Sequence, residues 1–115
     1  MEQKYYTHGT AAERWERARQ FFDAKEFTTA AGILGGLVEE VPEQVGPRLL
    51  LARSYYHSAQ LRRAEAQLRI IVDRDPVEGY ARLMLGRTLE RQGRDAEATP
   101  HLRMAAALAG EFPEG

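Results

Sequence analysis

Cysteine is absent from the chain, so a disulfide bond and a thiolate metal site are both excluded. The 115 residues suffice for one domain with its own core, but not for two. A composition of 43% hydrophobic and 29% charged residues is ordinary for a soluble globular protein. The fold must therefore be held together by packing alone.

Long apolar runs are also missing. No stretch reaches the ~18 apolar residues that a membrane span needs, and we expect no membrane partner. The first ten residues, MEQKYYTHGT, contain no apolar run and do not resemble a secretion signal. We therefore expect a cytoplasmic protein.

Lysine is scarce: Lys4 and Lys25 are the two lysines among sixteen cationic residues. Residues 45–94 hold ten arginines against five acidic residues, while acidic residues outnumber basic ones on both sides. A GC-rich genome would produce the arginine bias with no functional cause. A basic stripe is also the footprint of RNA-binding helical repeats. The pI of about 6.3 and the interleaved acidic residues argue against a nucleic-acid partner.

What the sequence does contain is an internal repeat with a period of about 34 residues. Small or apolar residues recur in four columns: Ala18, Ala52 and Gly86; Ala30, Ala64 and Ala98; Leu34, Leu68 and Leu102; and Phe21, Tyr55 and Leu89. A fixed period of this length indicates one supersecondary unit that is repeated and stacked. The period predicts a single domain over 11–112, with units 11–44, 45–78 and 79–112, a leader at 1–10 and a tail at 113–115.

Each unit is expected to hold two helices joined by a turn. Thr10 and Glu13 form a capping box that starts the first helix, and Pro42 and Pro76 close the first two units. Pro100 either delays the last helix to a start at Thr99 or bends it. The expected helices span about 11–24, 28–41, 46–58, 62–75, 79–92 and 96–109.

The columns resemble the tetratricopeptide repeat, a helix–turn–helix unit of about 34 residues. In the third unit Leu85-Gly86, Gly93, Ala98 and Ala105 carry the resemblance. It implies an all-α fold, an α-solenoid of three units and about six helices without a separate C-terminal capping helix. One departure is clear: the usual tryptophan column holds Arg14, Arg48 and Arg82.

The resemblance also implies that the first helices of the units line a concave groove, where partners commonly bind. Carried over column by column, the groove residues are Trp15, Arg19, Phe22, Leu49, Leu50, Arg53, Tyr56, His57, Leu83, Met84, Arg87 and Arg91. Guanidinium groups match carboxylates, and arginine and aromatic side chains dominate binding energies. We therefore predict an adaptor that binds an acidic, partly hydrophobic peptide. The alternative is that Arg19, Arg53 and Arg87 are solvated, or paired with internal acids such as Glu16 and Glu90.

Two further surfaces predict self-association instead, with a homodimer as the product. Gly32, Gly35 and Gly36 interrupt the second helix, although each glycine costs about 1 kcal/mol relative to alanine. They indicate either close packing on a neighbouring helix or, at Gly32 and Gly36, the approach of another chain. The last helix presents a partly apolar surface, with Leu102, Ala105 and Leu108 as the candidate contacts.

Catalytic signatures are missing. His8, His57 and His101 lack the spacing of paired metal ligands, and no phosphate loop, nucleophile motif or paired-carboxylate signature occurs. We expect no enzymatic activity, no cofactor and no metal.

Overall fold

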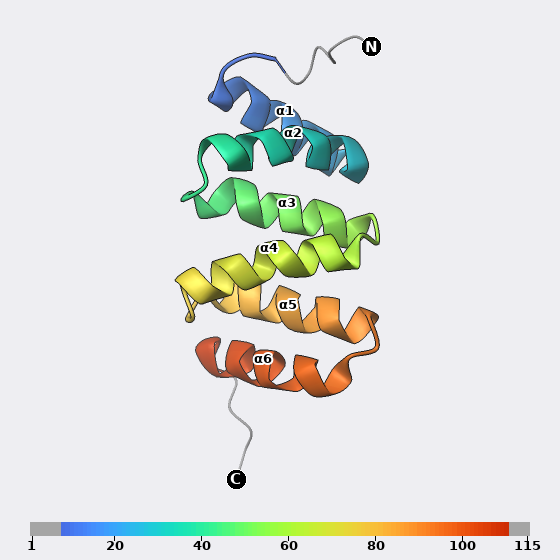
Figure 1. The fold of residues 1–115 in the computed structure, drawn as a ribbon, viewed down its shortest axis with the longest axis vertical. Helices are drawn as coiled ribbons and strands as arrows, with labels where there is room; N and C mark the ends of the chain where they lie inside the picture. The colour runs from blue at the N-terminus through green and yellow to red at the C-terminus, as the bar shows by residue number, and fades with distance from the viewer. Residues whose placement is uncertain (1–7, 111–115) are drawn as a thin grey trace. The chain divides into compact units, whose positions relative to one another are not determined.

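The computed structural model describes residues 8–110, so the expected tail at 113–115 and residues 1–7 of the expected leader lie outside the described residues. Within 8–110 the chain forms six α-helices and no strand (Figure 1). These are α1 (Ala11–Asp23), α2 (Phe27–Glu40), α3 (Val45–His57), α4 (Leu61–Arg74), α5 (Gly79–Arg91) and α6 (Asp95–Leu108). Each helix starts and ends within one residue of its expected bounds, and the all-α prediction is confirmed.

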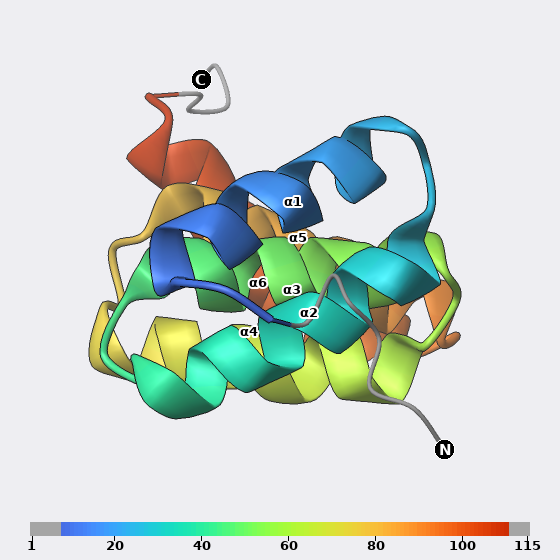
Figure 2. The same cartoon turned by 90° about the horizontal axis from the view of Figure 1, so that it is seen from above.

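Contacts divide the chain into two compact units, residues 1–60 with α1, α2 and α3, and residues 61–115 with α4, α5 and α6. The single domain of three repeats stays a prediction. In the first unit α1 and α2 run antiparallel and join through a short turn after Asp23 (Figure 2). The predicted capping box starts α1: Thr10 Oγ1 accepts from the Glu13 amide at 3.1 Å, and Glu13 Oε1 accepts from the Thr10 amide at 2.9 Å.

The turn inside each helix pair has the same backbone conformation. Lys25, Ala59 and Gly93 occupy equivalent positions of successive repeats, and their φ angles are 64°, 61° and 76°. The residue after each donates its amide to a carbonyl in the last turn of the preceding helix, at 2.8 to 2.9 Å. Such a left-handed residue closes many helices and favours glycine. The chain has glycine at this position in the third repeat alone.

The core of the first unit lies where α1, α2 and α3 meet. Its buried residues are Ala18, Ala30, Ala31, Ile33, Leu34, Leu37, Val38, Leu50 and Leu51. Leucine and valine recur on α2 at spacings of three and four, so one face of that helix is buried between its two neighbours. The predicted columns of small residues supply Ala18 and Ala30, both fully buried.

In the second unit a residue of the small-residue column, Gly86, lies at a close contact between two helices. Gly86 of α5 faces Leu102 of α6, and a Cβ placed on Gly86 would lie 2.6 Å from Leu102 Cγ. Glycine therefore allows these two helices to approach closely. The neighbouring Leu85, Leu89 and Ala98 are buried in the same unit.

The structure excludes one of the two alternatives that the sequence left open at Pro100, and one of the two at the glycines of α2. The last helix does not begin at Thr99: α6 starts at Asp95 and contains Pro100. The glycines of α2 are not packed closely on a neighbouring helix, because a Cβ added at Gly32, Gly35 or Gly36 would have no atom within 4 Å. The spacing of glycines did not reveal which face of α2 they occupy.

Arg14, Arg48 and Arg82, which occupy the column usually held by tryptophan, donate hydrogen bonds to the backbone just before their helices. Arg48 Nη2 donates to the Pro42 carbonyl at 3.0 Å, and Arg82 Nε donates to the Pro76 carbonyl at 3.1 Å, so the same contact recurs in successive repeats. Arg14 makes the corresponding bond to the Gly9 carbonyl and a bidentate pair with Glu40, at 2.7 and 2.8 Å. These arginines replace a large aromatic residue with hydrogen bonds to the backbone.

A buried carboxylate links α4 to the turn between α5 and α6. Glu65 of α4 is 8% exposed and accepts hydrogen bonds from Arg94 at 2.7 Å, Arg69 at 2.9 Å and Gln92 at 3.1 Å. Burial by itself would raise the pKa of Glu65, but hydrogen bonds from Arg94, Gln92 and Arg69 outweigh it and lower the pKa to about 2. The carboxylate is therefore charged across the physiological range.

Candidate peptide-binding site

A pocket of about 250 Å³ lies between α1 and α3 in the first unit. Half of the twelve predicted groove residues line it: Trp15, Arg19, Phe22, Leu49, Leu50 and Arg53. Residues three or four apart share one face of a helix. Trp15, Arg19 and Phe22 therefore lie on one face of α1, and Leu49, Leu50 and Arg53 come from the facing side of α3. Asp23 and Gly46 complete the lining and were not predicted.

Arg53 lies over an aromatic ring in this pocket. Its guanidinium carbon is 4.7 Å from the centre of the Phe22 ring. A cation over the ring face is attracted by the ring quadrupole, and the stacking restricts the guanidinium without using its hydrogen-bond donors in the ring contact. Arg19 is exposed on α1 at the same pocket. The pocket thus combines two guanidinium groups with indole, phenyl and leucine side chains.

Aromatic rings continue from the pocket toward the end of α3. His57 stacks on Phe27, with ring centres 4.7 Å apart, and its edge meets Phe22 at 5.8 Å and Tyr56 at 5.5 Å. The structure therefore brings together three predicted groove residues, Phe22, Tyr56 and His57. Phe27 was not predicted as a groove residue, because Phe27 begins α2 and the predicted groove residues come from the first helix of each unit.

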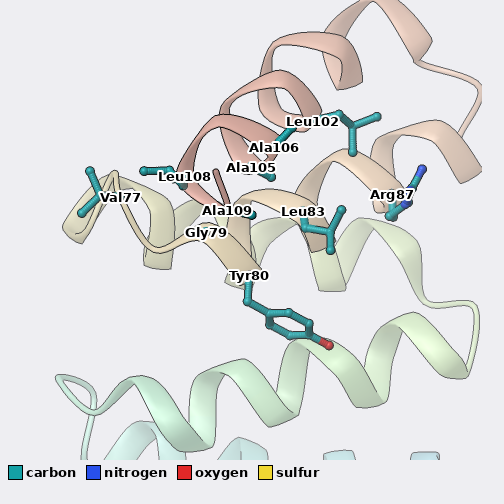
Figure 3. Close-up of a pocket in the computed structure, with 10 residues that line it drawn as sticks. All are labelled: Val77, Gly79, Tyr80, Leu83, Arg87, Leu102, Ala105, Ala106, Leu108 and Ala109. Atoms are coloured by element: carbon teal, nitrogen blue, oxygen red, sulfur yellow. The ribbon is translucent and has the colours of Figure 1, made fainter. Parts of the chain in front are cut away.

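The remaining predicted groove residues belong to α5. Leu83 and Arg87 line a second pocket, of about 460 Å³, between α5 and α6 (Figure 3). Arg91 is exposed in the last turn of α5, whereas Met84 is 8% exposed and lines neither of these two pockets. Arg87 Nη1 lies 3.1 Å from Glu90 Oε1. This ion pair is the internal pairing that the sequence left open as an alternative at Arg87.

The α5–α6 pocket also contains the residues predicted for self-association on the last helix. Leu102, Ala105 and Leu108 lie along α6 and line the pocket together with Leu83 and Arg87 (Figure 3). These two sets were predicted to lie on different surfaces, because the repeat columns do not show that neighbouring helices share a cavity. Gly32 and Gly36, the other predicted self-association residues, are exposed on α2.

Other chemistry is not evident in the part of the chain that the structure describes. Residues 8–110 contain no group of three or more metal-ligating side chains. His101 Nδ1 lies 3.1 Å from Arg82 Nη1, and burial, together with the charge of Arg82, lowers the pKa of His101. None of the helices within 8–110 combines the length and apolar content needed to cross a bilayer.

Comparison with known proteins supports the repeat assignment. The sequence profile described as "Tetratricopeptide repeat" matches residues 21–80, slightly more than half of the chain. No sequence among curated proteins matches. Solved structures of MamA are similar in fold. The MamA fragment "41-end" from Desulfovibrio magneticus RS-1 is 20% identical, with a TM-score of 0.83 over 92% of this chain and 60% of that chain.

Two MamA mutants give the same result. One is 19% identical, with a TM-score of 0.83 over 90% of this chain and 57% of that chain. The other is 22% identical, with a TM-score of 0.75 over 85% and 69%. This chain therefore spans about six tenths of the length of most of these MamA chains. At such low identity the similarity shows the fold, an all-α array of tetratricopeptide units.

Proposed function

This chain belongs to the tetratricopeptide repeat family, whose members are protein-interaction modules, and on that premise we propose that it is an adaptor for an acidic, partly hydrophobic peptide segment of a partner protein. The observation that carries the proposal is the α1–α3 pocket, where Arg53 is stacked on Phe22 beside Arg19 and Trp15.

Charge defines the acidic part of the ligand. Arg19 and Arg53 place two guanidinium groups at the pocket against one carboxylate, Asp23. A guanidinium presents a planar fork of donors that binds a carboxylate with two parallel hydrogen bonds. Because Arg53 is restricted by the Phe22 ring, less side-chain freedom is lost when a ligand binds.

Apolar side chains define the hydrophobic part. Trp15, Phe22 and Leu49 line the same pocket, so a peptide that places an acidic residue on Arg53 brings its neighbouring side chains onto these surfaces. Tryptophan and arginine are the residues most enriched at binding hot spots. Arg87 is the third arginine of the predicted row and is proposed as a weaker contact, since Glu90 competes for its guanidinium.

Affinity capture with matched variants tests the proposal. The bait is the wild-type chain beside the triple variant Arg19→Glu, Arg53→Glu, Arg87→Glu, after circular dichroism shows that both are folded. The control carries Arg62→Glu, Arg63→Glu and Arg74→Glu, three exposed arginines that line neither pocket, and has the same net charge. We expect partners that the wild type and the control retain and the triple variant loses.

Direct binding then defines the ligand. Peptides from the captured partner are titrated by fluorescence anisotropy, and Arg53→Lys is compared with Arg53→Gln. Lysine keeps the charge but not the fork or the planar stacking, so Arg53→Lys should restore only part of the affinity. Capture lists that are identical for wild type and the triple variant would contradict a role for this pocket.

Self-association is the second candidate function, and the open face of α2 favours it. Space is free within 4 Å of a Cβ placed at Gly32 or Gly36, so the backbone of another helix could approach there. Light scattering tests this: a dimer has twice the monomer mass of 13.0 kDa. Gly32→Leu with Gly36→Leu should return a dimer to monomer, and a monomeric wild type would exclude this function.

A further inference from the structure

Three columns of the repeat are buried on α2 and α4 but line the α5–α6 pocket on α6. On α2, Leu34, Leu37 and Val38 are buried in one cluster with Leu50 and Leu51 of α3. Their equivalents one repeat later, in α4, are Leu68, Ile71 and Val72, which are also buried, and α5 is the next helix packed against α4. The next equivalents are Leu102, Ala105 and Ala106 of α6, and these line the pocket (Figure 3). The pocket therefore occupies the position on α6 that a covering helix fills on α2 and on α4.

The helices that do cover this position share a pattern of four buried positions. The buried residues of α3 include Pro47, Leu50, Leu51 and Ser54, and those of α5 include Ala81, Met84, Leu85 and Thr88. Both sets have the spacing i, i+3, i+4 and i+7, which is one face of a helix. Position i+7 holds a hydroxyl residue in both helices, and each hydroxyl donates a hydrogen bond within its own helix. Ser54 donates to the Leu50 carbonyl, and Thr88 donates to the Met84 carbonyl.

The chain's own first helix does not carry this pattern. At the equivalent positions α1 has Glu13, Glu16, Arg17 and Gln20, all polar and none buried. If α1 of a second copy covered α6, these side chains would be buried against Leu102, Ala105 and Ala106, where charged groups lose hydration without partners. A head-to-tail contact between copies of this chain is therefore disfavoured.

We infer that the α5–α6 pocket is a docking site for an amphipathic helix of a partner protein, with a compact residue at i, two large apolar residues at i+3 and i+4, and a small residue at i+7. Alanine replaces the larger residues of α2 and α4 at two of the three columns, so the i+3 and i+4 side chains have more room than Leu50 and Leu51 have in the first unit. The site is independent of the arginine pocket on α1 and α3.

Charge adds a second requirement. Arg87 lines the pocket with its side chain about half exposed, and Arg103 is exposed on α6. The partner helix is therefore acidic on the flanks of its apolar face, which favours association and orients the helix. Exposed Val77, Tyr80 and Leu108 surround the pocket and give the helix further apolar contact.

A designed peptide tests the site with the full chain. The probe is a peptide of about four helical turns, held helical by a side-chain staple on its solvent face because short helices are marginal in water. It carries Ala, Met, Leu and Thr of α5 at i, i+3, i+4 and i+7, and glutamate on its flanks. The control peptide differs at those four positions, where it carries the Glu, Glu, Arg and Gln of α1. Fluorescence anisotropy should show saturable binding of the probe and none of the control.

Two protein variants locate the binding. Ala106→Glu places a charge in the pocket, and Ala107→Glu makes the same change on the neighbouring residue, which does not line it. We expect Ala106→Glu to weaken binding of the probe at least about tenfold, and Ala107→Glu to leave it within about twofold. Circular dichroism confirms that both are folded. The double variant Arg19→Glu, Arg53→Glu, whose two positions line the α1–α3 pocket and not this one, should bind the probe as the wild type does.

Three results would overturn the inference. The probe fails to bind at concentrations up to about 1 mM; it binds Ala106→Glu as tightly as the wild type; or the unliganded chain doubles its mass on light scattering and Ala106→Glu abolishes the doubling. The last result would make the occupant a second copy of this chain.

Discussion

The Leu102 side chain lies in the space that a side chain on Gly86 would need, with Leu102 Cγ 2.6 Å from an ideal Cβ at that position. We expect Gly86→Ala to destabilise the chain by about 1–2 kcal/mol, because steric overlap outweighs the gain in helix propensity. Gly36→Ala is the matched control, since its Cβ meets no atom within 4 Å; it should stabilise by about 1 kcal/mol. Urea unfolding followed by circular dichroism measures both, and equal effects of the same sign would refute the steric argument.

The left-handed turn residues predict opposite effects at equivalent positions. Ala59 has a φ of 61°, which costs a non-glycine residue about 1–2 kcal/mol, partly offset by the greater flexibility of unfolded glycine. Ala59→Gly should therefore stabilise by about 0.5–1 kcal/mol, and Gly93→Ala should destabilise by about 1 kcal/mol. Thermal unfolding of the two variants and the wild type checks the order; a lower Tm for Ala59→Gly would contradict it.

Acid should weaken the second unit through Glu65. A carboxyl whose pKa is lower in the folded state stabilises the fold above its unfolded pKa of 4.5, and the contribution is lost as the pH falls toward the folded value of about 2. We expect a loss on the order of 2 kcal/mol in this window. The measurement is urea unfolding of wild type and Glu65→Gln from about pH 7 to pH 2.5. The stability difference should shrink as the pH falls, and a constant difference would exclude Glu65 as its source.

Arg48 should matter more than its surface counterparts. It is 6% exposed and donates to the Pro42 carbonyl at 3.0 Å. Arg48→Met keeps most of the side-chain volume but leaves that carbonyl without this donor, so we expect a destabilisation of about 1–3 kcal/mol. Arg62→Met, at an exposed position of α4, should change stability by less than about 0.5 kcal/mol. Similar values for the two variants would show that the hydrogen bond is not important.

The repeat period located every helix because its markers are local. The Thr10–Glu13 capping box and the closing prolines Pro42 and Pro76 act within a few residues of their own positions, and the structure keeps helix bounds within one residue of the expected ones. The packing at Gly86 was also predictable, since its column holds alanine or glycine in all three units.

Side-chain partners were less predictable, because they depend on how helices meet. Nothing in the columns of Arg14, Arg48 and Arg82 shows that these side chains reach the backbone of the preceding turn. The resemblance to the tetratricopeptide repeat implied that Phe22 and Arg53 share one groove, but their stacking, and the contribution of Phe27, depend on how the helices pack in three dimensions. For the same reason the sequence left open whether the glycines of α2 pack against a neighbouring helix, which the structure excludes.

The four positions that distinguish α1 from α3 and α5 also restrict how such a gene can grow by duplication. A tandem copy of residues 45–78 would bring Pro47, Leu50, Leu51 and Ser54 to the new junction, where a preceding helix can bury them. A copy of residues 11–44 inserted at that junction would bring Glu13, Glu16, Arg17 and Gln20 against the preceding helix instead. Burying unpaired charges there costs several kcal/mol. Residues 45–78 can therefore be duplicated within the repeat array at a lower cost in stability than residues 11–44.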